Sequence, residues 1–139
     1  MSATRSDQIA VVFGGAGFIG GHLLARLAAS GRYRRLVSYD IAAPKAAVAG
    51  VDYVVGDVRE PIAVDGEVAG AEIYNLAAVH TTPGHQDWEY FWTNVNGATA
   101  VCAFARAIDA RFLLFTSSIS VYGPTEEPVD ERFKPSPTS

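Results

Sequence analysis

Three glycines near the start of the chain, Gly14, Gly17 and Gly20, have the spacing of a dinucleotide-binding turn. They follow the apolar run Ile9 to Phe13, where a buried strand would turn into a helix. In such a turn the first glycine allows the tight bend, the second lets the backbone approach a pyrophosphate, and the third lets the helix pack closely on the strand. The free N–H groups at the helix start would then face the phosphates. Because glycine spacing alone is a weak signal, a flexible loop is the alternative.

Two acidic residues agree with a dinucleotide site. Asp40 ends the apolar segment Leu36 to Asp40, twenty residues after Gly20, where such units place the acid that binds the ribose hydroxyls. A carboxylate there repels a 2′-phosphate, so it favours NAD over NADP. Asp57 follows the next apolar run, Val51 to Val55. Two acids at neighbouring strand ends predict an adenine pocket, although a strand-end aspartate can also cap a turn.

Hydroxyl and small side chains follow two further apolar runs. Thr116 and Ser118 come directly after Arg111 to Phe115, and open α/β sheets place their chemistry at the carboxyl ends of strands. The run Ala71 to Ala77 is a further expected strand, and the small Ala77 and Ala78 at its end would leave room for a cofactor to cross the sheet. Small residues also occur at ordinary strand ends, so this second observation decides little by itself.

The segment Trp88 to Asp109 is predicted to form one helix with an unusually wide apolar face. At about 100° per residue, one stripe consists of Phe91, Val95, Ala98, Cys102 and Ala105. A second stripe lies beside it, and the combined arc exceeds what packing on a sheet requires. The excess predicts a partner helix, most simply from a second copy of the chain in a homodimer; the alternative is cover from other chain segments.

Asn94 projects into this apolar arc, where a buried amide must be hydrogen-bonded. It is therefore a candidate for positioning a catalytic group or for holding an ordered water. The alternative is a structural asparagine that bends the helix.

These runs alternate strand and helix patterns, which predicts an α/β fold with a parallel sheet. At 139 residues, 49% of them hydrophobic, the chain fits one globular domain. We expect a dinucleotide-binding portion over residues 1–123. Residues 124–139 hold four of the seven prolines and no periodic pattern, which predicts a Pro-rich loop.

Composition excludes several classes of partner. The net charge of −4 lacks the basic excess needed to bind a nucleic-acid duplex, and no apolar stretch is long enough to cross a membrane. The three histidines lack the spacing of a metal site. The single cysteine, Cys102, predicted to be buried on its helix, indicates a reducing compartment, and the cytoplasm is the expected location.

Six motifs complete the pattern: Gly14 to Gly20, Asp40, Gly56 to Val58, Asn75 to Ala78, Asn94 to Thr99 and Ser117 to Gly123. As a set, in this order, they closely resemble the extended short-chain dehydrogenase/reductases, and within them the NAD-dependent nucleotide-sugar epimerases and dehydratases. The resemblance implies a doubly wound Rossmann sheet with strand order 3-2-1-4-5 and NAD bound across its crevice. It also implies oxidation of a sugar carbon by hydride transfer to NAD, with later return of the hydride.

The resemblance assigns roles to individual residues. It implies that Ser118 holds the substrate hydroxyl. Asn94, singled out above by its place in the apolar arc, is the second candidate of the catalytic site. It implies a set of cofactor-binding residues: Gly14, Gly17, Phe18, Ile19, Gly20, Asp40, Asp57, Val58, Leu76, Ala77, Ala78 and Thr116.

The chain departs from the family pattern at Phe13, where a threonine is usual, which affects a local hydrogen bond of the loop. It also lacks the family's proton-transfer pair, a tyrosine followed four residues later by a lysine. Ile41 and Asp130 stand four residues before its two lysines, Lys45 and Lys134. We therefore expect the 139 residues of this chain to be the cofactor-binding part of a longer enzyme and to be inactive alone. A reductase or hydroxysteroid-type dehydrogenase, and a non-catalytic NAD-binding regulator, are the alternatives.

Overall fold

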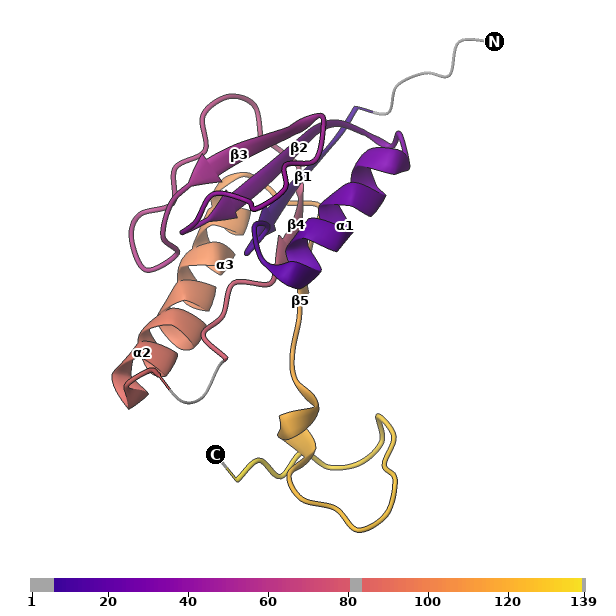
Figure 1. Cartoon of the computed structure of the whole chain (residues 1–139), viewed down its shortest axis with the longest axis vertical. Coiled ribbons are helices and arrows are strands. Elements are labelled where there is room, and N and C mark those ends of the chain that lie inside the picture. Colours follow the sequence, from indigo (N-terminus) through magenta and orange to yellow (C-terminus); the bar gives the residue numbers. More distant parts are fainter. Residues whose placement is uncertain (1–6, 81–83, 139) are drawn as a thin grey trace.

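A computed structural model describes residues 7–80 and 84–138. Its centre is one sheet of five parallel strands in the order β3-β2-β1-β4-β5 (Figure 1). The strands are β1 (Gln8–Phe13), β2 (Tyr33–Asp40), β3 (Val51–Val55), β4 (Glu72–Asn75) and β5 (Phe112–Phe115). This topology confirms the predicted doubly wound fold.

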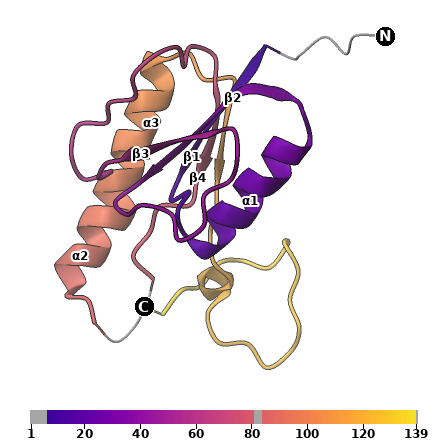
Figure 2. The same cartoon turned by 45° about the horizontal axis from the view of Figure 1, so that its top comes forward.

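Helices cover both faces of the sheet, with α1 (Phe18–Ala29) on one side and α3 (Ala98–Ala107) on the other (Figure 2). From Ile9 on, strand β1 is apolar and buried, because successive side chains point to opposite faces and each face is covered. Phe13 is fully buried on the α3 side, between the rings of Tyr39 and Phe104, at centroid distances of 5.3 and 5.7 Å. The phenylalanine at position 13, where threonine is usual, therefore forms part of the core.

The helix expected over Trp88 to Asp109 is not regular. It consists of α2 (Asp87–Phe91), a π-helical segment η1 (Trp92–Gly97) and α3. A π-turn contains an extra residue, so it rotates the residues before it by about 100° relative to α3. Angular positions counted at a constant 100° are therefore wrong across residues 92–97.

The predicted apolar stripe consequently divides into a buried and an exposed part. On α3, Val101 and Ala105 are buried against the sheet, whereas Cys102, predicted to be buried, is exposed. Before α3 the apolar side chains face outward. Their exposed fractions are 62% for Trp88, 58% for Phe91, 49% for Trp92 and 48% for Val95.

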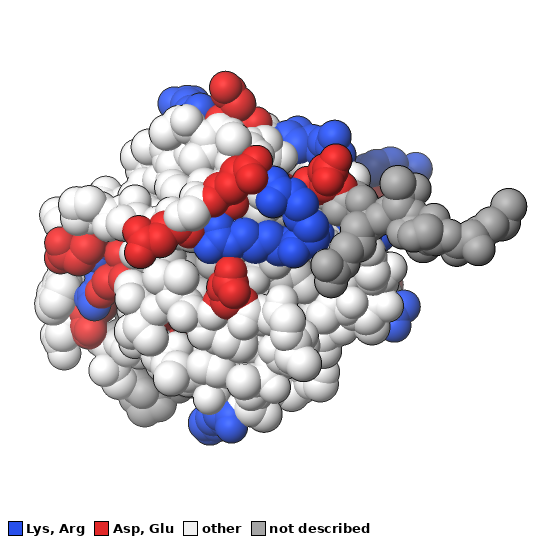
Figure 3. All heavy atoms as spheres, turned by 90° about the horizontal axis from the view of Figure 1, so that it is seen from above, with Lys and Arg blue, Asp and Glu red and all other residues white. Residues whose placement is uncertain are grey.

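At the amino end of the sheet, Arg35 fastens the long connection between β3 and β4. Its guanidinium donates to the carbonyl oxygens of Asp65 and Glu67, at 2.7 and 2.8 Å, and to the Asp52 carboxylate at 2.9 Å. Figure 3 shows this end of the molecule, with basic and acidic side chains interleaved. Arg35 therefore has a structural role, and it lies at the end of the sheet away from the carboxyl ends of the strands.

The chain after β5 runs away from the sheet (Figure 1). It forms one turn of 3₁₀ helix, η2 (Ile119–Tyr122), and an irregular loop that returns where the Ser136 amide donates to the Val121 carbonyl at 2.9 Å. No helix or strand follows Tyr122 in the described part of the chain. Among the helices of that part, none has the length and apolarity needed to cross a membrane.

Candidate functional site

The carboxyl ends of the five strands form one continuous edge. After four of the strands, the next residue of the chain donates its backbone N–H to a carbonyl oxygen near the end of a neighbouring strand. These bonds bring the predicted site residues to the same edge. The bonds are Gly14 to Tyr39 (2.9 Å), Gly56 to Asp40 (2.8 Å), Leu76 to Phe13 (2.9 Å) and Thr116 to Asn75 (3.2 Å).

The structure leaves no room for a side chain at two of the three glycines, Gly14 and Gly20. Gly14 has a φ of +77°, and a Cβ there would lie 2.8 Å from the Leu76 carbonyl carbon. A Cβ on Gly20 would overlap the Gly14 carbonyl oxygen, so α1 packs against the turn only with glycine there. A Cβ on Gly17 would have one neighbour, the Gly14 oxygen at 3.3 Å. The backbone at Gly17 is therefore open to a ligand.

The start of α1 is suited to an anion. Its N-cap, Gly17, forms no side-chain cap, and the first turn contains no acid. The first amides of a helix have no intrahelical acceptor, and the helix dipole places partial positive charge there. The side chains of Phe18 and Ile19 are 83% and 59% exposed. Their backbone amides are therefore the groups that could hold a phosphate.

Asp40, at the end of β2, contacts the glycine turn directly. Its Oδ2 accepts from the backbone amide of Ala16 at 3.0 Å, and its Oδ1 accepts from the amide of Ala42 at 3.1 Å. Each carboxylate oxygen has two acceptor positions, so Asp40 can bind ribose hydroxyls and hold the turn together. Strand-end spacing identifies Asp40 but does not reveal this contact with Ala16.

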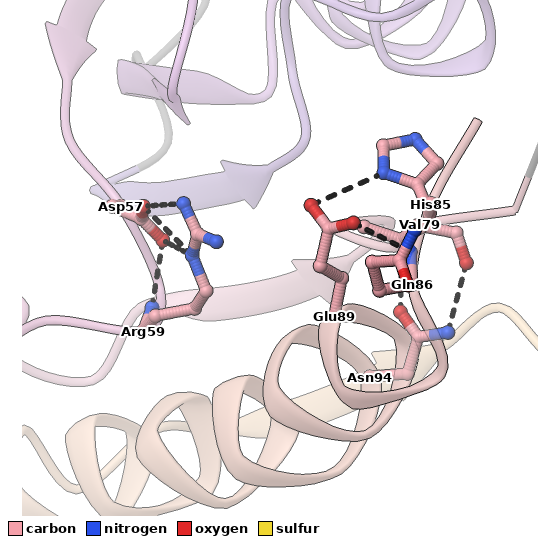
Figure 4. A network of polar contacts seen from close by, with 7 residues as sticks. All are labelled: Asp57, Arg59, Val79, His85, Gln86, Glu89 and Asn94. Atoms are coloured by element: carbon pink, nitrogen blue, oxygen red, sulfur yellow. Dashed lines mark hydrogen bonds and ion pairs between the residues drawn. The ribbon is translucent and has the colours of Figure 1, made fainter.

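Asp57 lies beyond the neighbouring strand, β3, and is paired with Arg59 (Figure 4). This pairing lowers the pKa of the Asp57 carboxyl, chiefly through the Arg59 side-chain hydrogen bond. Val58, between them, is only 6% exposed and packs against Gly97, where a Cβ would lie 2.7 Å from a Val58 methyl. Val58 can therefore meet a ligand only through its backbone. Arg59 was not among the residues predicted for the site. Its position two residues after Asp57 was the feature of the sequence that could have indicated the pair.

After β4, Leu76 and Ala77 are half-buried and Ala78 is exposed. Asn94 holds the next residue, Val79, by its backbone (Figure 4). The Asn94 Oδ1 accepts from the Val79 amide at 2.8 Å, and Nδ2 donates to the Val79 carbonyl at 2.9 Å. One donor and one acceptor position of the Asn94 amide remain. Asn94 thus holds the loop that follows β4 and itself lies within the π-helical segment.

Ser118 is exposed beyond β5 and caps η2. Its Oγ accepts from the Ser120 amide and donates to the Ser120 hydroxyl, both at 3.1 Å. Within residues 7–80 and 84–138, no hydrogen bond joins Ser118 to Asn94. The same residues contain no group of three or more metal-ligating side chains.

A family model described as "NAD dependent epimerase/dehydratase family" matches residues 10–139. The chain belongs to this family. Its cofactor is NAD, and the glycine turn, the uncapped helix start and Asp40 fit such a dinucleotide. The epimerase/dehydratase fold is shared by solved structures. UDP-galactose 4-epimerase aligns with 94% of this chain and 45% of its own, at 28% identity and a TM-score of 0.82. MoeE5, solved with UDP-glucose and NAD, aligns with 95% of this chain and 43% of its own, at 26% identity and a TM-score of 0.76.

Curated relatives have several activities. The ceramide reductase of Caulobacter vibrioides (strain NA1000 / CB15N) is 35% identical over 120 residues, which are 83% of this chain and 36% of the relative. UDP-glucuronic acid decarboxylase 2 of Arabidopsis thaliana is 35% identical over 139 residues, 93% of this chain and 30% of the relative. The chain thus spans about a third of the length of these relatives.

Proposed function

We propose that the protein is an epimerase or dehydratase of a nucleotide sugar and that these 139 residues are its cofactor-binding part. The observation that carries the proposal is the uncapped, glycine-lined start of α1 beside Asp40. Bound NAD would supply the hydride acceptor for oxidation of a sugar carbon and the donor that returns the hydride. Neighbours support the substrate class, because MoeE5 was solved with UDP-glucose and, separately, with UDP-glucuronic acid.

Each part of the edge has a binding role in this proposal. The amides of Phe18 and Ile19 hold the pyrophosphate, with Gly17 leaving space for it. Asp40 accepts from the ribose hydroxyls, and Asp57 with the Val58 backbone meets the adenine. Four residues line the nicotinamide side of the crevice: Leu76, Ala77, Ala78 and Thr116.

Ser118 orients the substrate hydroxyl, but it needs a base to move a proton. Its partners in the described chain are groups of Ser120, which are not bases at neutral pH. The lysines, Lys45 and Lys134, follow Ile41 and Asp130 at four residues instead of a tyrosine. We infer that proton transfer depends on residues outside these 139 and that the chain alone binds NAD without turnover.

The test combines NAD binding by calorimetry with turnover of UDP-glucose, UDP-galactose and UDP-glucuronic acid followed by NMR. We expect the 139-residue chain to bind NAD and to convert none of these sugars, and a longer protein that contains a Tyr-x-x-x-Lys pair to convert one of them with no net NADH absorbance. In that longer protein, Ser118→Ala should lower kcat by about 100-fold, whereas Ser30→Ala, at the far end of α1, should leave it unchanged. A protein that does not bind NAD contradicts the proposal.

A reductase is the second candidate, favoured by the 35% identity to a ceramide reductase. It would change the NADH concentration in proportion to product, whereas an epimerase would not. A third possibility, motivated by the missing Tyr-x-x-x-Lys pair, is a non-catalytic regulator that binds NAD without converting any substrate; an intact pair in a longer protein would exclude it. The same absorbance and NMR measurements separate the three.

We also propose a homodimer through the predicted helix from Trp88 to Asp109, because its first half exposes two tryptophans, Phe91 and Val95. Light scattering should give twice the monomer mass. Phe91→Glu should yield monomers, while Ile119→Glu, 83% exposed on η2, should not. A monomeric wild-type protein refutes the dimer. We propose the cytoplasm as the location, because a chain with the single cysteine Cys102 cannot form an internal disulfide.

A further inference from the structure

A cleft opens at the amino ends of β1 and β4, at the end of the sheet away from the glycine turn. Its volume is about 400 Å³, whereas one water molecule takes up roughly 30 Å³ of the liquid. Its lining includes the buried residues Ile9 and Glu72 and the exposed residues Asp7 and Arg111. Pockets for small organic ligands begin at about 300 Å³, so the cleft is large enough to hold such a molecule.

Glu72 is a buried carboxylate in this cleft with one oxygen left over. Its Oε2 accepts from the hydroxyls of Tyr33 and Tyr74, the second at 3.2 Å. Arg32 Nη2 lies 3.8 Å from Oε1, which is too far for a hydrogen bond, and donates instead to the Gln8 side chain at 3.2 Å. Within the described part of the chain, Oε1 therefore has a distant positive charge but no hydrogen-bond donor.

The Oε1 atom of Glu72 can be reached from outside the protein. Ser38 Oγ is the one side-chain oxygen or nitrogen of the described residues that is both shielded from solvent and without a hydrogen-bond partner. Because Oε1 also has no such partner, it is not shielded, and Glu72 lines the cleft. A donor that enters the cleft can therefore reach a carboxylate oxygen whose surroundings are otherwise buried.

Arg111 supplies the opposite charge on the rim of the same cleft. Its backbone amide donates to the Ala71 carbonyl at 3.0 Å, which holds this residue beside the start of β4. Its guanidinium forms no hydrogen bond or ion pair with the other described residues. Asp7 adds a second carboxylate to the rim, which favours a charged donor over an uncharged one. The cleft thus offers an acceptor for an ammonium group and a donor for a carboxylate.

We propose that this cleft binds a small zwitterion, a free amino acid, whose ammonium group donates to Glu72 Oε1 and whose carboxylate accepts from Arg111. The proposal does not depend on the proposed function. Water or a simple amine would satisfy Glu72 alone, and an inorganic anion would satisfy Arg111 alone. A hard metal cation requires about six or more oxygen ligands, which one free carboxylate oxygen does not provide. A molecule with both charges uses both groups.

NMR titration of the ¹⁵N-labelled chain tests the proposal, in a buffer free of amines and carboxylates. The probes are glycine, β-alanine and γ-aminobutyrate, which carry the same two charges at increasing separation. We expect at least one of them to shift the amide signals of Gly70 and Arg111, with roughly millimolar affinity. Methylammonium and acetate, alone or mixed, should bind at least about 10-fold more weakly, because the two charges are not linked.

Variants at the two charged groups identify the site. Arg111→Ala and Glu72→Gln should each weaken the best probe by about 10-fold, because each removes a charge-assisted hydrogen bond. Arg106→Ala and Glu67→Gln are the matched controls, since both residues are exposed and neither lines the cleft. Their affinity should match that of the wild type. If Glu72→Gln does not fold, Arg111→Ala, at an exposed position, decides the question.

Three results would overturn the proposal. The first is the absence of shifts with all three probes up to about 50 mM, which would leave the cleft to water. The second is methylammonium binding as tightly as the amino acids, because Arg111 would then take no part. The third is an unchanged affinity in the Arg111 variant, which would place the probe elsewhere. NAD added to the same sample reports on the proposed function separately, so that NAD binding without amino-acid binding overturns this proposal alone.

Discussion

The Asp40 carboxylate accepts a hydrogen bond from the backbone amide of Ala16, 24 residues earlier in the chain, at 3.0 Å. This bond ties the end of β2 to the glycine turn after β1. The other oxygen of Asp40 accepts from the backbone amide of Ala42. The Asp40 side chain thus holds backbone amides of the glycine turn and of the loop after β2. Any change of Asp40 therefore affects the shape of the site as well as its selectivity.

Asp40→Asn should weaken NAD binding by about 10-fold, because only one of the two backbone amides keeps an oxygen acceptor. The variant should not bind NADP tightly either. Although the negative charge that repels a 2′-phosphate is gone, the loop that would hold the ribose has lost one of its two bonds to residue 40. Calorimetry with both dinucleotides measures this. Asp52→Asn, at the opposite end of the sheet in an exposed pair with Arg35, is the control. A variant that binds NADP as tightly as the wild type binds NAD would refute the anchoring role.

Asn94→Asp should lower the free energy of unfolding by about 1–3 kcal/mol. Its second carboxylate oxygen would face the Val79 carbonyl, to which Asn94 Nδ2 now donates. Urea denaturation at pH 7 measures the loss. Asn96→Asp, two residues away in the same π-helical segment and also half-buried, is the matched control. Equal stability of the Asn94 variant and the wild type would show that the clamp is dispensable.

Ser38→Ala should leave stability unchanged or raise it by up to about 1 kcal/mol. Ser38 is 1% exposed, and its Oγ is the one buried side-chain oxygen or nitrogen without a hydrogen-bond partner among the described residues. It lies beneath Gly15, where a Cβ would overlap that Oγ. Gly15→Ala should therefore cost about 1–3 kcal/mol, and less when combined with Ser38→Ala. Strict additivity in denaturation experiments would exclude the contact.

Tyr33 should make the protein sensitive to alkali. Its hydroxyl donates to the buried Glu72 carboxylate, and burial followed by this hydrogen bond raises the Tyr33 pKa far above its usual value. A raised pKa means that stability is present below about pH 10 and is lost as the pH rises further. Tyr33→Phe should flatten this decline in unfolding free energy. Burial also raises the pKa of Tyr39, so part of the decline should persist. An identical slope in both proteins would contradict the prediction.

Gly123→Ala should open the loop after η2. Gly123 has a φ of +70°, and a Cβ there would overlap the Ser136 carbonyl oxygen where the loop closes. Trypsin should then cut after Arg132 several-fold faster. Gly70→Ala is the control, because Gly70 has a φ of +67° but open space around a Cβ. If both variants are cut at the wild-type rate, the close contact with Ser136 does not hold the loop.

The sequence predicted the strands from their apolar runs, and this pattern is strongest in β1, which is buried on both faces from Ile9 on. Strands β3 and β5 are apolar runs as well but contain no buried residue. The run Ile9 to Phe13 and β3 appear where apolar residues predicted them, and strand order followed from the family motifs. The helix after Trp88 was less predictable. A single π-turn leaves no clear mark in residue type, yet it rotates Phe91 and Val95 away from the face expected at a constant period.

The sequence by itself determined the fold class, the glycine turn and the acids at the strand ends, because these depend on spacing along one chain. Only the tertiary structure decided which atoms those residues contact. Asp40 meets Ala16, Asn94 holds Val79, and Arg59 turns back on Asp57. Such contacts depend on distances across strands and loops and on the competition of several donors for one carboxylate. Residue type and spacing specify neither.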